Sequence, residues 1–354
     1  MERQDNRAIG QTGIRFIMET LEATRRQDHM EDFHDKNVLI TGGAGFIGSA
    51  IARRLVHYGA KVTLVDSMIP EYGGNLFNID DIKDQVQFNI SDVRDAYAMG
   101  YLVRNQDFLF NLAGQTSHID SMHHPIEDLE INAKAQLSTL EACRMHNSDI
   151  RIVFASTRQI YGRPQYLPVD EKHPIVPVDV NGINKTSGEW YHLLYQDVYD
   201  IPTSVLRLTN TYGPGMRIAD ARQTFVGIWI RLLLEGKPFK VWGGQQKRDF
   251  NFVDDVVDAF LLSASQESAI GRVFNLGSTE VVTLLELAAC LSEFGDSGYE
   301  VSEFPAERKK IDIGDYYSDY ALIADTLNWI PKVELHEGLR KTIAYYQSNM
   351  EHYV

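Results

Sequence analysis

Residues 36–66 read KNVLITGGAGFIGSAIARRLVHYGAKVTLVD, and this stretch decides the fold. A short apolar run leads into the glycine-rich segment TGGAGFIG (41–48). Ile47, Ile51 and Leu55 follow at four-residue spacing, which predicts a helix, and a second apolar run comes after it. A strand, a tight turn, a helix and a second strand are typical of a parallel sheet with crossover helices.

Three glycines in the turn suit a bound dinucleotide. Gly42 allows the tight turn, Gly45 lets backbone N–H groups approach a pyrophosphate, and Gly48 lets the helix pack closely on the strand. The helix N-terminus then favours the negative charge of the phosphates. Asp66, at the end of the second strand, is placed to bind ribose hydroxyls, and residues 67–72 contain no Lys or Arg to accept a 2′-phosphate. The pattern predicts NAD rather than NADP.

The alternation of strand and helix patterns continues after residue 66. Short apolar runs alternate with helix-length segments as far as residue 208, and shorter strands and helices then mix irregularly. We therefore expect an α/β protein: a Rossmann-type doubly wound parallel sheet with a smaller mixed α/β C-terminal lobe. The expected divisions are a polar extension (1–35), an NAD-binding domain (36–208) and a partly interleaved substrate-binding lobe (209–354). An amphipathic helix within the extension is expected to pack on the body or on a second subunit.

Composition excludes several classes of function. The 354 residues carry a formal net charge of −15, which argues against binding nucleic acid or an anionic membrane. No apolar run reaches the ~18 residues of a membrane span, and no signal peptide is apparent. Cys143 and Cys290 lie far apart without metal-ligand spacing. We expect a cytoplasmic protein with reduced thiols and no bound metal.

Several motifs carry a family resemblance. They are TGGAGFIG, DSMIPEYGGNLFN, NLAGQTSH, FASTRQIYG, NGINK, RLTNTYGPG and QKRDFNFVDDVVDAF, in this order. The chain resembles the extended short-chain dehydrogenase/reductase family, and within it the NAD-dependent nucleotide-sugar epimerases and dehydratases, over roughly residues 36–348. The resemblance implies bound NAD and a nucleoside-diphosphate sugar, with a UDP-sugar favoured. It also implies a homodimer built through the helices predicted near 127–145 and 181–199.

The resemblance assigns the NAD site to the glycine turn and to the ends of the next strands. Asp92, after the third strand, would meet the adenine end. The expected cofactor-binding residues are Gly42, Gly45, Phe46, Ile47, Gly48, Asp66, Asn75, Asp92, Val93, Leu112, Ala113, Gly114 and Lys185.

The catalytic set of the family is Ser/Thr, Tyr and Lys. Thr157 matches the residue that hydrogen-bonds the reacting hydroxyl, and Lys185 matches the lysine that holds the nicotinamide ribose. The tyrosine position, however, is Asn181. An amide does not ionise near neutral pH, so Asn181 orients a water or the substrate but does not accept the hydroxyl proton as a tyrosine does.

Three interpretations of this replacement remain open. Another group supplies the base: Tyr161, a tyrosine elsewhere, or a water held by Asn181 and Lys185. Alternatively, groups of the sugar itself carry the proton. In the third interpretation, redox chemistry has been lost and the protein only binds NAD and a nucleotide sugar.

The residues after Thr157 bear on the reaction type. The 4,6-dehydratases of the family carry an Asp-Glu pair there, whereas this chain has Arg158 and Gln159. Epimerisation through a 4-keto sugar is therefore the leading hypothesis, with dehydration or decarboxylation as the alternative. Arg158 is either a structural arginine or an anion contact near the sugar, for example with a uronate carboxylate.

The resemblance also assigns the substrate side. Asn210 and Arg248 match residues that contact the substrate phosphates, and Arg308 lies near a second such arginine. Gln115, Ser117 and His118 fall in the loop that contacts the sugar. His118 is either a proton shuttle or polar lining.

Overall fold

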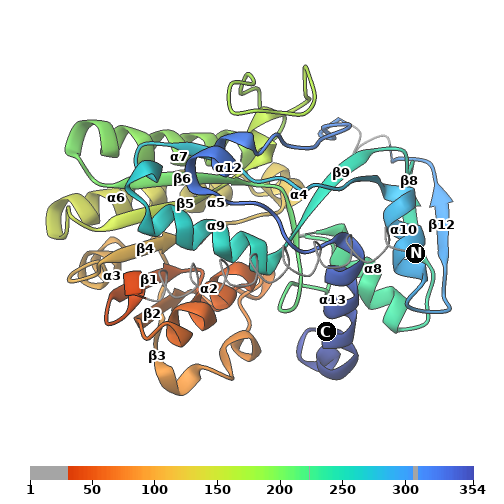
Figure 1. The fold of residues 1–354 in the computed structure, drawn as a ribbon, viewed down its shortest axis with the longest axis horizontal. Coiled ribbons are helices and arrows are strands. Elements are labelled where there is room, and N and C mark those ends of the chain that lie inside the picture. Colours follow the sequence, from red (N-terminus) through yellow and green to blue (C-terminus); the bar gives the residue numbers. More distant parts are fainter. Residues whose placement is uncertain (1–30, 223, 306–309) are drawn as a thin grey trace, which may run out of the picture.

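The computed structural model describes residues 31–222, 224–305 and 310–354. The helix expected within residues 1–30 and the site residue Arg308 therefore lie outside the described residues. Figure 1 shows the strands and helices of the glycine-turn region at one end and the C-terminal elements α8, α10 and α13 at the other.

A seven-stranded, fully parallel sheet forms the larger part, as the sequence predicted. Its order is β10-β6-β5-β4-β1-β2-β3, so the direction of strand progression reverses between β1 and β4. Ligands of such sheets bind at the carboxyl ends of the strands beside this reversal. The strands are β1 (Asn37–Thr41), β2 (Lys61–Asp66), β3 (Val86–Ile90), β4 (Phe108–Asn111), β5 (Arg151–Thr157), β6 (Thr203–Leu208) and β10 (Val273–Asn275).

Helices cover both faces of this sheet (Figure 1). Val38 and Ile40 of β1 belong to the core beneath α2 and α9, whereas Leu39 between them packs with the core beneath α3 and α6. This alternation is why the apolar run of β1 has no polar side. The helices of these two layers are α2 (Phe46–His57), α3 (Ala96–Leu102), α6 (Ala135–His146), α7 (Val180–Tyr199) and α9 (Val253–Ser265). Among the described residues, no helix is long and apolar enough to cross a bilayer.

Two short helices lead into α6 and form one wall of the site. Ser117 caps α4 (His118–His123), because its hydroxyl accepts a hydrogen bond from the Asp120 N–H. α5 (Pro125–Leu129) continues through a π-helical segment at Glu130–Lys134.

The smaller lobe contains two small sheets, β11-β9-β7 and β12-β8. The chain interleaves, because β10 from this half of the sequence completes the large sheet. The elements are β7 (Asn210–Tyr212), α8 (Phe225–Leu234), β8 (Phe239–Trp242), β9 (Lys247–Phe252), β11 (Val281–Thr283), α10 (Leu284–Ser292), β12 (Tyr299–Ser302), α12 (Ala321–Leu327) and α13 (Leu335–Asn349).

Candidate active site

One cavity runs along the carboxyl ends of the large sheet, and the glycine turn forms one end of it. Gly42 has a positive φ of 69°. A Cβ on Gly48 would lie 2.2 Å from the Gly42 carbonyl oxygen, and one on Gly45 would lie 3.1 Å from the same atom. In the part of the chain that the structure describes, no side chain caps the N-terminus of α2, so its first N–H groups remain available at the cavity. This glycine cradle fits a pyrophosphate held by backbone groups.

Asp66 lines the cavity at the end of β2. Its carboxylate accepts hydrogen bonds from the N–H groups of Ala44 (3.1 Å) and Met68 (3.0 Å). Burial raises the pKa of Asp66, and these two hydrogen bonds oppose the rise. Each oxygen keeps a lone pair for a ribose hydroxyl, so the expected role of Asp66 suits its geometry.

The other predicted cofactor residues divide into two places. Most line the cavity: Gly42, Gly45, Phe46, Ile47, Gly48, Asp92, Val93, Leu112, Ala113, Gly114 and Lys185. Asn75 does not: it caps a 3₁₀ turn, accepting from the Phe77 N–H, and it lines a separate pocket together with Arg217 and His352. The Asp92 carboxylate is engaged by the Arg94 guanidinium at 2.6 Å.

Thr157 and Lys185 line the same cavity where β5 ends beside α7; we call this part the reaction end, and the part at the glycine turn and Asp66 the cofactor end. Thr157 ends β5, and its hydroxyl accepts from the Gln159 N–H at 3.2 Å. Lys185 is buried on α7, and its Nζ donates to the Ala155 carbonyl at 3.1 Å. Burial lowers the pKa of Lys185 to about 8, although the charge of Asp128 opposes this effect. Gly114 makes room for the ammonium, because a Cβ there would lie 2.8 Å from Nζ.

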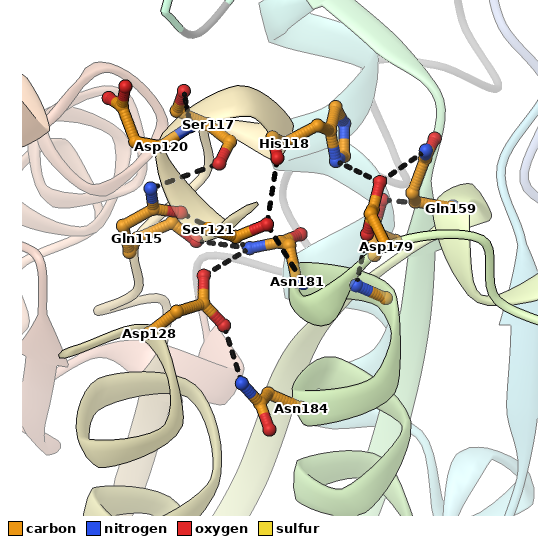
Figure 2. Close-up of polar contacts among 12 residues, drawn as sticks. Gln115, Ser117, His118, Asp120, Ser121, Asp128, Gln159, Asp179, Asn181 and Asn184 are labelled. Carbon is orange, nitrogen blue, oxygen red and sulfur yellow. Dashed lines mark hydrogen bonds and ion pairs between the residues drawn. The ribbon is translucent and has the colours of Figure 1, made fainter. Parts of the chain in front are cut away.

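Asn181 lines the cavity, but its amide nitrogen is turned toward the wall (Figure 2). Nδ2 donates to the Gln115 carbonyl at 2.8 Å and to the Asp128 carboxylate at 3.1 Å. Asn132 and Asn184 donate to the same buried carboxylate at 3.0 and 2.8 Å. Asn181 therefore ties α7 to the loop after β4 and to α5.

Neither Tyr161 nor Tyr72 is suited to accept the hydroxyl proton in place of a tyrosine at position 181. Tyr161 is fully buried beneath the cavity, donates to Asn275 at 2.7 Å and accepts from Arg207. Burial raises its pKa to about 12. Among the described residues, Tyr72 is the tyrosine that lines the cavity, and burial and a hydrogen bond with Glu127 raise its pKa. Both phenols stay protonated near neutral pH.

The loop after β4 alternates between wall and cavity. Gln115 and Ser117 are buried in the wall, where the Gln115 Nε2 donates to the Ser117 carbonyl at 3.0 Å. Thr116 and His118 line the cavity instead. Extended backbone sends successive side chains to opposite sides, which explains the division.

The arginines predicted on the substrate side lie in different settings. Arg158 lines the cavity, donates to Asn210 at 2.8 Å through Nη2, and stacks over Tyr316. Its Nη1 is buried and has no hydrogen-bond partner among the described residues. Arg248 lies outside the cavity lining and donates to the carbonyls of Lys247 and Gly314. Burial and then the charge of Arg158 lower the pKa of Arg248 to about 10.

Comparison with known proteins decides the family. The sequence profile of the NAD-dependent epimerase/dehydratase family matches residues 38–277, which is more than half of the chain. The chain belongs to this family. The fold and the glycine cradle agree with that membership, and the cofactor of the family is NAD.

Relatives within the epimerase/dehydratase family differ in their reactions. A putative UDP-glucose 4-epimerase of Methanocaldococcus jannaschii is 32% identical, covering 88% of this chain and 99% of that protein. UDP-glucuronic acid decarboxylase 1 of Xenopus tropicalis is 30% identical over 90% of this chain and 73% of its own length. The UDP-glucose 4-epimerase of Thermotoga maritima, solved with UDP-glucose, is 30% identical with a TM-score of 0.81, covering 89% and 99% of the two chains.

Sequence reasoning missed two buried acids at this site, Asp128 and Asp179. Asp179 caps α7 by accepting from the Gly182 N–H at 2.7 Å, and it lies 3.2 Å from His118. Its position two residues before the helix predicted at 181–199 was the available signal, because Asp is a favoured N-cap residue. Asp128 gave little local signal, since two of its amide donors, Asn181 and Asn184, come from α7 more than 50 residues away. The third, Asn132, lies in the π-helical segment after α5.

Proposed function

We propose that this family member is a nucleotide-sugar epimerase that works through a transient 4-keto sugar. The supporting observation is that one cavity joins the glycine cradle and Asp66 to Thr157, Asn181 and Lys185. A dinucleotide on the cradle and a sugar beside Thr157 would therefore share one enclosed space. Relatives named as UDP-glucose 4-epimerases favour a UDP-sugar as the substrate.

When bound, NAD supplies a two-electron oxidant that takes a hydride from a sugar carbon and returns it. The chain supplies the positioning. In this proposal Thr157 donates its hydroxyl to the reacting sugar oxygen, and Lys185 holds the ribose of the cofactor; both side chains line the cavity. The Asn181 amide holds the wall in place through Gln115 and Asp128. Hydrogen bonds from these groups to a bound sugar would be stronger in the enclosed cavity than in water.

The side chains after Thr157 favour epimerisation over dehydration. Elimination needs an acid and a base at the neighbouring sugar carbons. Arg158 lines this part of the cavity, while Gln159 is buried and its amide donates to Asp179 at 2.7 Å. Neither residue is a carboxylic acid, so the pair does not supply the proton transfers that elimination requires.

Decarboxylation is the second candidate, and one observation favours it. The buried Nη1 of Arg158, which has no partner in residues 31–222, 224–305 and 310–354, suits a carboxylate on the sugar. A 4-keto uronate loses CO₂ without a carboxylate base. An epimerase of uronic acid sugars would use the same contact.

A panel of UDP-, GDP-, CDP- and dTDP-sugars, including UDP-glucuronate, tests the proposal. Proton NMR should show a new anomeric signal from an epimer of one substrate, with no CO₂ released. Release of CO₂ from UDP-glucuronate would support the decarboxylase. A sugar that binds but persists unchanged while NAD stays oxidised would mean that the protein binds these ligands without turnover.

We also propose a homodimer formed by α5, α6 and α7. Five apolar side chains of α5 and α7 are more than half exposed in the single chain: Ile126, Ile183, Trp190, Leu194 and Val198. Ile183, Trp190, Leu194 and Val198 are spaced by seven or four residues and share one face of α7, and an exposed apolar face of this kind marks an interface. Trp190→Glu should convert a dimer into a monomer in light scattering, whereas Tyr97→Glu on α3 should leave the dimer intact. A wild-type monomer at micromolar concentration would overturn this proposal.

A further inference from the structure

A histidine–aspartate pair lies at the reaction end of the cavity (Figure 2). The Nδ1 atom of His118, at the start of α4, lies 3.2 Å from the Asp179 carboxylate at the start of α7. The Asp179 side chain is fully buried, whereas 38% of the His118 side chain is exposed. His118 lines the cavity that also contains Thr157 and Asn181.

The carboxylate of Asp179 is fixed from several directions. It accepts from the Gly182 N–H and from the Gln159 amide, each at 2.7 Å. Burial raises the pKa of Asp179, but the contact with His118 and the hydrogen bonds from Gly182 and Gln159 together outweigh burial, and the net pKa is lowered. The ionised carboxylate favours a proton on Nδ1, which leaves the Nε2 lone pair of the neutral imidazole free to accept a proton.

The other groups at this end are less suited to that task. Asn181 does not ionise, and its amide nitrogen is engaged by Gln115 and Asp128. Tyr161 is buried away from the cavity, and Tyr72 has a raised pKa. Lys185 is the competitor, but its Nζ donates to the Ala155 carbonyl and lies over the Phe154 ring.

We propose that His118, oriented by Asp179, accepts the hydroxyl proton that a tyrosine at position 181 would otherwise accept. The inference rests on the proposed function. In this step the sugar O–H bond breaks and an Nε2–H bond forms on His118. The O–H electron pair becomes the second C–O bond, while the carbon-bound hydrogen leaves with its own electron pair to NAD, the oxidant. Returning the proton from Nε2 reverses the step after the ketone has turned.

His118→Gln tests the proposal directly, with His123→Gln on the same helix as the matched control because His123 is exposed outside the cavity. Single-turnover formation of reduced cofactor should slow at least about 100-fold in His118→Gln, the usual worth of general base catalysis, and imidazole should restore part of the rate in His118→Gly. Calorimetric affinity for the nucleotide sugar should change less than about threefold, and His123→Gln should behave as wild type.

A second readout needs no turnover. In cofactor-free protein, ¹⁵N NMR should find the neutral His118 ring protonated on Nδ1, and Asp179→Asn should remove this preference while still capping α7. Asp179→Asn should also slow single turnover about tenfold or more, with its melting temperature showing that it remains folded.

Three results overturn the inference in distinguishable ways. If His118→Gln turns over within threefold of wild type, Lys185 or the sugar itself carries the proton. If the neutral ring is protonated on Nε2 in wild type, the acceptor atom is blocked. If wild type converts no sugar at all, the proposed function fails and this inference fails with it.

Discussion

The two ends of the cavity are built in different ways. The cofactor end depends on backbone shape, since Gly42, Gly45 and Gly48 lie within one turn of the chain. The reaction end depends on side chains that meet from distant positions: Asn181 reaches Gln115 across 66 residues and Asp128 across 53. Atoms added at the cofactor end would therefore collide with the backbone, whereas side chains removed at the reaction end would leave buried polar partners unsatisfied.

The largest effect should come from adding one methyl group to the cofactor end. In Gly48→Ala the new Cβ would lie 2.2 Å from the Gly42 carbonyl oxygen, so the turn must move. We expect NAD affinity, measured by calorimetry, to fall about 100-fold, equivalent to about 3 kcal/mol. Gly100→Ala on α3 is the control, because its Cβ would meet only the His146 ring at 3.4 Å. Binding within threefold of wild type in Gly48→Ala would show that this turn is not a rigid cradle.

At the reaction end, the largest effect on the free energy of unfolding should come from the buried charge of Lys185. The folded-state pKa of about 8 lies below the ordinary 10.5, so the unfolded chain binds more protons between these pH values. In cofactor-free protein, Lys185 should therefore make stability rise between about pH 8 and pH 10.5, by about 3 kcal/mol at about 1.36 kcal/mol per pKa unit. In urea unfolding, Lys185→Met should be more stable than wild type near pH 7, and the difference should close as the pH rises through this window.

The control for that measurement is Lys172→Met, because Lys172 is exposed. Its stability difference from wild type should not vary with pH. The same flat difference in Lys185→Met would mean that Lys185 is hydrated in solution, and the contrast between the two ends would weaken.

Removing the Asn181 amide should have a smaller effect on stability. Asn181→Ala deprives the buried Asp128 carboxylate of one of its three amide donors and the Gln115 carbonyl of its partner. A loss of about 1–3 kcal/mol is expected in urea unfolding, because buried acceptors are left unsatisfied. Asn89→Ala on the exposed edge of β3 should cost less than about 0.5 kcal/mol. Equal losses in the two variants would argue against an anchoring role.

The smallest expected effect is on cofactor choice. Asp66→Ala removes the carboxylate that would bind the ribose hydroxyls and repel a 2′-phosphate. The preference for NAD over NADP should fall about tenfold, or about 1.4 kcal/mol, as measured by competitive binding. Asp84→Ala, at an exposed position in the 3₁₀ turn before β3, should leave the preference unchanged. An unchanged preference in Asp66→Ala would remove Asp66 from the recognition of the ribose.

Much of the cofactor end could be predicted from the sequence. The turn, the helix after it and Asp66 lie within about 30 consecutive residues, and local spacing fixes their geometry. Asn75 was the exception, because its capping of a 3₁₀ turn and its contact with the carbonyl of His352 depend on where the C-terminus packs. Arg248 shows a similar limit at the substrate side: its motif matched, but the described structure surrounds it with backbone carbonyls instead of exposing it to the cavity.

The sequence by itself determined the parallel sheet, its crossover helices and the replacement of tyrosine by Asn181, because periodicity and residue identity are local properties of the chain. Only the tertiary structure decided what that replacement means. The partners of Asn181, and the pairing of His118 with Asp179 across 61 residues, exist because α7 packs against α4 and α5. Contacts between side chains so far apart follow from packing in three dimensions, which no spacing along the chain specifies.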